Sequence, residues 1–348
     1  MGNQILKQSV GLDVSKDSVA ACFSQQEVGK PFRILSSKTF TSAASGLRRM
    51  DEWIKGYQHE SVALHLMMEA TGVYYEELAY FLHGKGYRVS VMLPNKTSAF
   101  AKSLDYKSKT DRVDAKKLSQ MSLERDLPKW RPPSDTMLTI KRLCRERGEL
   151  LDEKTAFNNR LHAKKHAHAP EKSSLKRAKD TIKFLQKHIQ EIESAIKKAI
   201  AADPQIKERL ERVCTITGVA TATAATVVSE ANGFVLFKNK AQVVSYAGYD
   251  VVLNQSGTSI KGATKISKKG NHRIRKALHF PAWTAIKHNP AMKEIYNRVF
   301  DKTKIKMKGA VAVQRKLLVL IYTLYKNNQD FNPNYQSSKI TIDPSKKG

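Results

Sequence analysis

The stretch SVGLDV, residues 9–14, is the part of the sequence from which the N-terminal half can be interpreted. It is short and mostly apolar, and it carries one acid, Asp13, close to its end. A polar break at residues 15–17 separates it from a second strand-like run at 18–23, and a third follows at 32–40. Three adjacent strands joined by short loops predict an antiparallel meander.

Beyond the meander, the pattern alternates between helix and strand. We predict helices at 43–56, 73–83 and 112–124, and strands at 61–68 and 87–93. The order strand, strand, strand, helix, strand, helix, strand, helix is that of the ribonuclease H-like fold. Residues 1–130 are therefore expected to form an α/β domain of this class, which ends at Trp130-Arg131-Pro132-Pro133.

The rest of the chain is expected to be mainly helical. In residues 131–202, apolar positions recur at spacings of three and four, which indicates a coiled-coil region; they are Ile182, Leu185, Ile189, Ile192 and Ile196. Two long helices meeting near Pro170 predict either an intramolecular hairpin or a dimer-forming arm. Asp203-Pro204 opens a mainly α C-terminal domain, 203–332, and a flexible tail is expected at 333–348.

Charge limits the classes of partner. The chain holds 61 Lys and Arg against 32 Asp and Glu, a formal charge of +29 and an isoelectric point near 9.9. Such an excess favours a polyanionic partner. Because no run approaches the roughly 18 apolar residues of a membrane helix, and no signal peptide opens the chain, we expect a cytoplasmic, nucleoid-associated protein that binds nucleic acid and no membrane. The three scattered cysteines predict neither a zinc site nor a disulfide framework.

Four acids lie at the positions where this fold would bring them together. Asp13 is near the end of the first strand, and Glu69 follows the fourth, which is its neighbour in a ribonuclease H-like sheet. Asp111 and Asp114 open the last helix of the domain and share one of its faces, with Thr110 as its expected cap. Four close carboxylates need a cation, and Mg²⁺ is the hard, oxygen-preferring one. We therefore predict a magnesium site for phosphodiester chemistry.

These motifs resemble those of a known family. The blocks VGLDVSK (10–16), MEATG (68–72) and KTDRVDA (109–115) resemble the DEDD transposases of insertion-sequence family 110, whose N-terminal domain is similar to the RuvC resolvase. Further resemblance to the family's C-terminal domain lies in ITGV (216–219), YAGY (246–249), QSGTSIKG (255–262) and ISKKGN (266–271). The resemblance spans nearly the whole chain, in order.

The resemblance implies a mechanism that composition cannot. It implies a recombinase in which a C-terminal serine forms a covalent phosphoserine with DNA, and in which a structured bridge RNA pairs with target and donor DNA. It also implies a tetramer made of two dimers, with the carboxylates and the serine in different subunits, while the coiled-coil pattern favours a dimer. The matching serine is Ser256, and Ser259 is the close alternative. An unactivated serine is a poor nucleophile, so the residues alone favour none of the loop serines.

Basic residues surround the candidate serine. Residues 256–316 contain 16 Lys and Arg against only Glu294 and Asp301. The expected nucleic-acid-binding residues are Lys109, Arg112, Lys261, Lys265, Lys268, Lys269, Arg273, Arg275 and Lys276.

Weaker motifs and other functions stay open. Thr217-Gly218-Val219 predicts either a phosphate-binding helix-hairpin-helix or a plain turn, and His162, His166 and His168 favour a phosphate contact over a metal site. The competing functions are a metal-only nuclease or resolvase without a covalent intermediate, an actin-like or sugar-kinase-like phosphotransferase, and a basic RNA-binding module. The absence of a phosphate-binding glycine loop speaks against the phosphotransferase.

Overall fold

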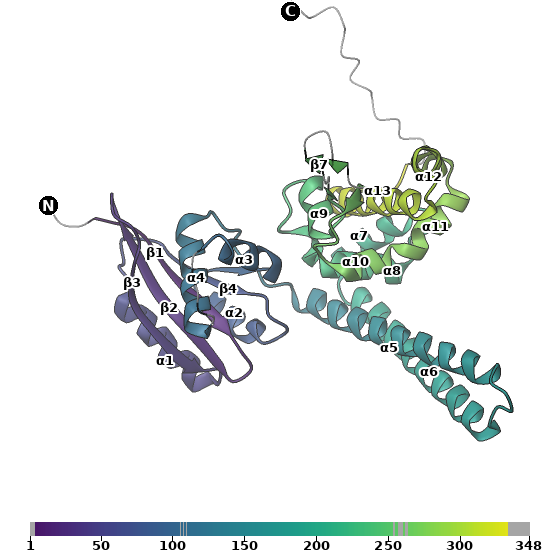
Figure 1. The fold of residues 1–348 in the computed structure, drawn as a ribbon, viewed down its shortest axis with the longest axis horizontal. Coiled ribbons are helices and arrows are strands. Elements are labelled where there is room, and N and C mark those ends of the chain that lie inside the picture. The colour runs from purple at the N-terminus through teal and green to yellow at the C-terminus, as the bar shows by residue number, and fades with distance from the viewer. Residues whose placement is uncertain are drawn as a thin grey trace, which may run out of the picture. The chain divides into compact units, whose positions relative to one another are not determined.

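The computed structural model describes residues 4–104, 106, 108, 110–252, 255–256, 260–261 and 264–332, with the backbone alone at 255–256 and 260–261. The chain divides into two compact units at Pro132-Pro133 (Figure 1). No helix in the described ranges is long and apolar enough to cross a lipid bilayer.

The first unit is built on a five-stranded mixed sheet. Strands β1 (Ile5–Val14), β2 (Ser18–Glu27) and β3 (Arg33–Thr41) form the antiparallel meander, and β4 (Leu64–Glu69) and β5 (Arg88–Met92) run parallel to β1. The order across the sheet is β3-β2-β1-β4-β5. This is the ribonuclease H-like arrangement that the sequence predicts, with β1 and β4 as neighbours.

Alternation along the strands divides the sheet into two faces. On one face, Val10 and Leu12 of β1 pack with apolar residues of α1 (Ala44–Tyr57) and α2 (Tyr75–Gly84). Successive side chains of a strand point to opposite faces, so residues 9, 11 and 13 of β1 point the other way. There they meet α4 (Asp111–Glu124), next to α3 (Pro94–Ala101), which the sequence analysis did not predict.

His65 of β4 is a buried histidine with a hydrogen-bonded ring. Its Nε2 lies 2.8 Å from the Ser90 hydroxyl, which itself donates to the Pro128 carbonyl at 2.6 Å. Burial, with the nearby Arg88 charge, lowers the pKa of His65 to about 4, against the opposing effect of Asp126.

We predict that stability falls as the pH drops from about 6.5 to about 4. In that window the unfolded histidine binds a proton that the folded one does not, and the full shift corresponds to about 3 kcal/mol. Urea unfolding at several pH values should show a flatter pH dependence for His65→Gln than for wild type. The exposed His168→Gln should keep the wild-type slope, and an unchanged slope in His65→Gln would reject this assignment.

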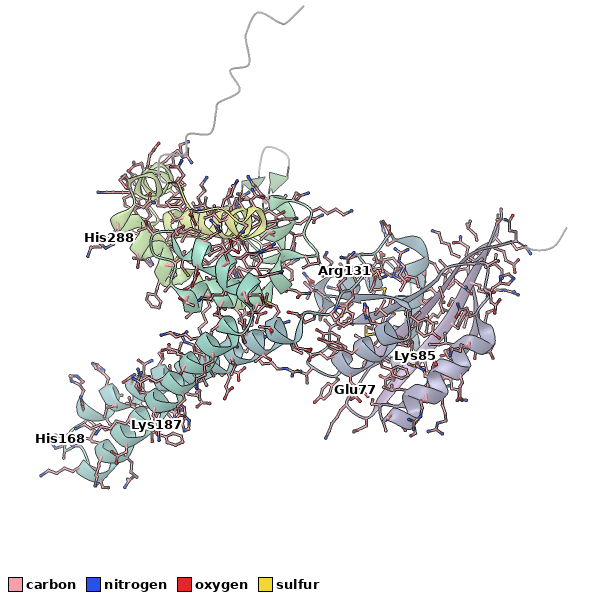
Figure 2. The ribbon with its side chains drawn as sticks, turned by 180° about the vertical axis from the view of Figure 1, so that it is seen from behind. Glu77, Lys85, Arg131, His168, Lys187 and His288 are labelled. Carbon is pink, nitrogen blue, oxygen red and sulfur yellow. The ribbon has the colours of Figure 1, made fainter. Side chains whose placement is uncertain are left out.

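The second unit begins with two long helices that pack on each other within one chain. They are α5 (Asp135–Lys165) and α6 (Lys172–Ala201). Ser134 caps α5 by accepting a bond from the Met137 amide at 3.2 Å. Leu185, Ile189, Ile192 and Ile196 are buried, and Ile182 is half-buried. His168 lies by the turn between the helices, where Figure 2 shows it at the end of the pair.

The remaining elements form a helical bundle. Its helices are α7 (Pro204–Cys214), α8 (Thr221–Glu230), the short η1 (Asn232–Phe234), α9 (Lys240–Tyr246), α10 (His272–Ala277), α11 (His279–His288), α12 (Pro290–Thr303) and α13 (Lys306–Asn327). Four two-residue strands lie between α9 and α10: β6 (Val251–Val252), β7 (Gln255–Ser256), β8 (Ile260–Lys261) and β9 (Lys265–Ile266). The predicted tail, 333–348, lies outside the described residues.

Candidate active site

A close backbone contact fixes helix α4 against strand β1. A Cβ atom added at Gly11 would lie 2.0 Å from the Ala115 carbonyl oxygen and 2.3 Å from the Ser119 nitrogen. Only glycine leaves room for a helix backbone so near a strand. Towards the start of β1, the Ser119 hydroxyl donates to the Ser9 carbonyl at 3.4 Å, and Lys7 Nζ donates to the Leu123 carbonyl at 2.8 Å.

These contacts between β1 and α4, which we call the β1–α4 ladder, recur at a regular spacing along both elements. Every two residues along β1 correspond to four residues back along α4, because two strand residues rise about 6.6 Å and four helical residues about 6 Å. The pairs are 7 with 123, 9 with 119 and 11 with 115. One further step of the same spacing leads from the pair 11 and 115 to residues 13 and 111, and the first turn of α4 contains Asp111 and Asp114. Thr110 caps that turn as predicted, since its hydroxyl accepts from the Val113 amide at 3.3 Å.

Glu69 belongs to the same face and the same end of the sheet. The parallel register of β1 and β4 pairs Leu12 with Met68, so that Asp13 and Glu69 are the next residues on each strand. Met67, which shares the face of Glu69, packs with Leu118 of α4. The strand register therefore puts Asp13 and Glu69 on the same face of neighbouring strands, and α4, which Asp111 and Asp114 open, packs on that face.

The carboxylates themselves are engaged by neighbouring side chains. Glu69 accepts hydrogen bonds from the hydroxyls of Thr71, at 3.3 Å, and Thr97. Asp114 is paired with Lys117 at 2.8 Å, and both are largely shielded from solvent. In the part of the chain that the structure describes, no three His, Cys, Asp or Glu side chains are placed to hold one metal ion. The donor set is nonetheless purely carboxylate, the chemistry that Mg²⁺ prefers.

The candidate serine lies in the second unit, on a small hairpin. The backbone of Ser256 on β7 pairs with Ile260 on β8. Ser259 and Lys109 lie outside the described residues, and so does the side chain of Lys261.

The base of the segment that carries Ser256 is a tightly packed frame. The Lys268 amide donates to the Gly248 carbonyl at 3.1 Å, and the Asn271 amide to the Tyr246 carbonyl at 2.7 Å. Gly248 has a φ of 73°, and a Cβ at Gly270 would lie 2.4 Å from the Tyr246 oxygen. Two motifs named in the sequence, YAGY and ISKKGN, thus meet and close the segment between them.

Sequence reasoning missed a buried charged residue, Glu230, that is hydrogen-bonded to Asn271 of this frame. Glu230 is only 2% exposed, yet it accepts two bonds from Arg145, at 2.6 and 3.0 Å, and one from Asn271 Nδ2 at 2.8 Å. Burial alone would raise the pKa of Glu230, but Arg145 and Asn271 outweigh it and lower that pKa. The sequence does show an acid, Glu230, at the end of an otherwise apolar helical run. It gives no indication of the partner, because Arg145 lies 85 residues earlier.

The predicted nucleic-acid-binding residues fall into two groups. Arg112, Lys265, Lys268 and Lys269 are exposed. Arg273 lies 3.8 Å from Glu149, and Lys276 pairs with Asp152. Arg275 serves the frame, because its Nη1 donates to the Ala247 carbonyl at 2.6 Å and to the Gly270 carbonyl at 3.3 Å.

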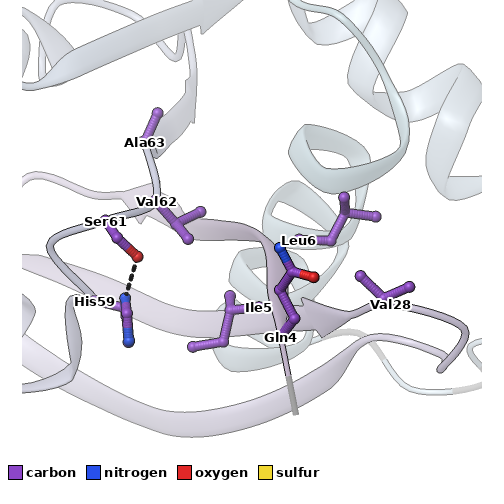
Figure 3. Close-up of a pocket in the computed structure, with 8 residues that line it drawn as sticks. All are labelled: Gln4, Ile5, Leu6, Val28, His59, Ser61, Val62 and Ala63. Atoms are coloured by element: carbon purple, nitrogen blue, oxygen red, sulfur yellow. Dashed lines mark hydrogen bonds between the residues drawn. The ribbon is translucent and has the colours of Figure 1, made fainter. Parts of the chain in front are cut away.

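The other features lie elsewhere. The rings of His162 and His166 are 4.5 Å apart. A pocket lined by residues 4–6, 28, 59 and 61–63 lies where β1 and β4 begin, at the opposite end of these strands from Asp13 (Figure 3). Ser61 and His59 are hydrogen-bonded at its rim at 2.9 Å. This pocket therefore takes no part in the carboxylate site.

Comparison with known proteins identifies related sequences along most of the chain. Residues 10–166 match the family model of DEDD transposases of the IS110 type, described as "Transposase", and residues 210–297 match the "Transposase IS116/IS110/IS902 family". The chain is 27% identical over 332 residues to the pilin gene-inverting protein of Moraxella bovis, covering 94% of this chain and 98% of that protein.

Two further similarities are more distant. The IS110 uncharacterized 43.6 kDa protein of Streptomyces coelicolor is 25% identical over 133 residues, which is 36% of this chain and 33% of that protein. The solved structure of RuvC from T. thermophilus in complex with a Holliday junction substrate is 11% identical, with a TM-score of 0.24, covering 32% of this chain and 90% of that one.

Proposed function

The chain belongs to the IS110 family of transposases, and from this premise we propose that it cuts and rejoins DNA with two sets of groups, the carboxylates of the first unit and a serine of the second. The observation that supports the proposal is the contact at Gly11, which fixes α4, the helix that Asp111 and Asp114 open, against the strand that carries Asp13. Such an arrangement serves phosphodiester chemistry. It has no evident use in a binding module.

Asp13, Glu69, Asp111 and Asp114 are the residues that would hold Mg²⁺. When bound, the ion stabilises charge on the phosphate oxygens during strand exchange. The role of the chain is to fix these carboxylates on two strands and one helix, and Thr97 and Thr71 orient Glu69 by hydrogen bonds. Arg112, exposed on the same turn as Asp111, is suited to contact a DNA phosphate.

Ser256 is the proposed nucleophile. Its hydroxyl oxygen forms a bond to the DNA phosphorus, the proton passes to a base or to solvent, and a deoxyribose oxygen leaves as a strand end. Attack by a second strand end reverses these bonds and releases the serine. Lys265, Lys268 and Lys269, exposed near the base of the segment, would hold the phosphate backbone.

Site choice is proposed to rest on a structured bridge RNA that pairs with both target and donor DNA. The active form is proposed to be a tetramer of two dimers, with the carboxylates and Ser256 supplied by different subunits. The Moraxella relatives are named for inverting a gene; the same cutting and rejoining would give inversion or insertion according to how the two sites are arranged.

A covalent-trapping experiment tests the serine. Wild-type protein with labelled DNA, the RNA of the element's end and Mg²⁺ should give a DNA adduct that survives denaturation and maps to Ser256. Ser256→Ala should give neither adduct nor cleavage, while Ser259→Ala should retain both. A metal-only nuclease, the alternative function, would leave Ser256→Ala fully active. Omission of the RNA should abolish sequence-specific cutting.

A further inference from the structure

Helices α10 and α11 present one continuous exposed face. They meet at Leu278, which ends α10 and precedes α11, and its φ of −87° and ψ of −4° lie in the right-handed helical region. Exposed positions recur along this face at intervals of four, four and three: Lys276, Phe280, Thr284 and Lys287. Spacings of three and four place side chains on the same side of a helix.

Phe280 stands in the middle of this face and is 77% exposed, more than any other large hydrophobic side chain in the described residues. The neighbouring His279 ring is nearly perpendicular to it, at 77°, with the ring centres 5.2 Å apart. Isolated exposed apolar residues are common. A phenylalanine with so large an exposed fraction, between two lysines, can however stack on another flat ring.

The helix beneath Phe280 is held firmly. Ile274, Leu278, Ala282 and Ala285 on the opposite face are fully buried. The turn at Gly218, which the sequence analysis noted as a weak phosphate-binding motif, packs directly on α11. A Cβ there would lie 2.8 Å from the Pro281 carbonyl oxygen and 3.2 Å from Thr284 Cβ. The ring therefore projects from a rigid support.

The charge around Phe280 indicates what it contacts. Lys276 and Lys287 flank it on the same face, and residues 256–316 contain 16 cations and two acids. Lys276 also pairs with the exposed Asp152 of α5, the acid that faces this surface from a neighbouring helix. A protein partner would have to neutralise this excess, whereas a nucleic acid brings phosphates and flat bases together.

We propose that Phe280 stacks on an unpaired nucleobase while Lys276 and Lys287 contact the phosphates beside it. The base must be unpaired because the face of a base is accessible only where the strand is open. The inference rests on the proposed function for the presence of open strands, and it adds a residue that neither the family motifs nor the sequence analysis assigned.

Binding of short oligonucleotides containing the fluorescent base 2-aminopurine tests this, with Mg²⁺ omitted so that no cutting occurs. Phe280→Ala is expected to weaken single-strand binding roughly 5- to 100-fold, and to change duplex binding by less than about twofold, since stacking on a closed duplex is absent. Phe280→Trp should retain binding and quench the fluorescence. Phe280→Leu, apolar but not aromatic, should behave as the alanine variant does.

Lys287→Gln is the matched control. It should weaken binding to single strands and duplexes alike and lower the salt dependence by about one unit of slope, whereas Phe280→Ala should leave the slope unchanged. DNA and RNA probes of the same sequence show which strand supplies the base.

Equal losses on duplex and single strand, or rescue by leucine, would overturn the stacking. So would a change of oligomeric state in Phe280→Ala with single-strand affinity intact, because that result assigns the ring to a second copy of the chain. If wild-type protein still forms the Ser256 adduct, any of these outcomes rejects only the proposed role of Phe280, and the proposed function is unaffected.

Discussion

Replacing Asp13 with asparagine is expected to slow DNA strand cleavage by on the order of a thousandfold or more, because a ligand to the proposed Mg²⁺ loses its charge. Asparagine has the same shape, and Asp13 is only half-buried, so the fold should survive. The measurement is the single-turnover cleavage rate of labelled DNA in Mg²⁺. DNA affinity, measured separately, should change little, since the residues proposed to bind DNA are the basic ones.

Asp17 supplies the matched control. It is exposed in the turn just after β1, where its carbonyl, rather than its side chain, accepts a bond from the Ser42 amide at 3.0 Å. Asp17→Asn should therefore cleave at the wild-type rate. Wild-type cleavage by Asp13→Asn would show that the carboxylate is structural, and the metal site would have to be abandoned.

Replacing Gly11 with alanine should destabilise the first unit by about 3 kcal/mol or more. The added methyl would meet the Ala115 oxygen and the Ser119 nitrogen, which are backbone atoms of a helix and cannot rotate away as a side chain would. Helix α4 must move off the sheet, which also displaces Asp111 and Asp114. Urea unfolding should detect the lost stability, and cleavage should fall even where the variant remains folded.

Gly56→Ala tests whether the effect is specific to Gly11. Gly56 lies exposed in α1, and nothing stands within 4 Å of its added Cβ. Alanine is the better helix former, so this variant should be equal to wild type or more stable by roughly 0.5–1 kcal/mol. A Gly11→Ala protein as stable as Gly56→Ala would refute the close contact.

Much of the first unit could be predicted because its signals are local. Short, mostly apolar runs between polar breaks indicated all five strands, and observed bounds differ from the expected ones by a few residues, as for β3 at 33–41 against 32–40. Helix α3 was missed because its eight residues begin at Pro94, directly after the predicted strand at 87–93, where a proline indicates the end of a strand. Proline is equally suited to the first turn of a helix, where its missing amide costs nothing.

The site was less predictable because its contacts are long-range. The sequence indicated which acids share a domain. It could not show that Thr97 engages Glu69, since that pairing depends on how α3 docks, whereas the pair of Asp114 and Lys117, three residues apart on α4, is local. The ion pair of Arg145 and Glu230 was invisible for the same reason: its partners come from α5 and α8, and neither helix carries a motif that points to the other.

The ladder between β1 and α4 also limits where this chain tolerates insertions and deletions. Lengthening the chain at residues 102–109 does not change the spacing of residues within α4, so Gly11 can still meet Ala115 and Ser119. One residue inserted between Asp114 and Ala115 would rotate both acids by about 100° around the helix axis relative to Gly11. Relatives should therefore vary in length before α4 and hold a constant count of residues within it, as should any domain graft made at this position.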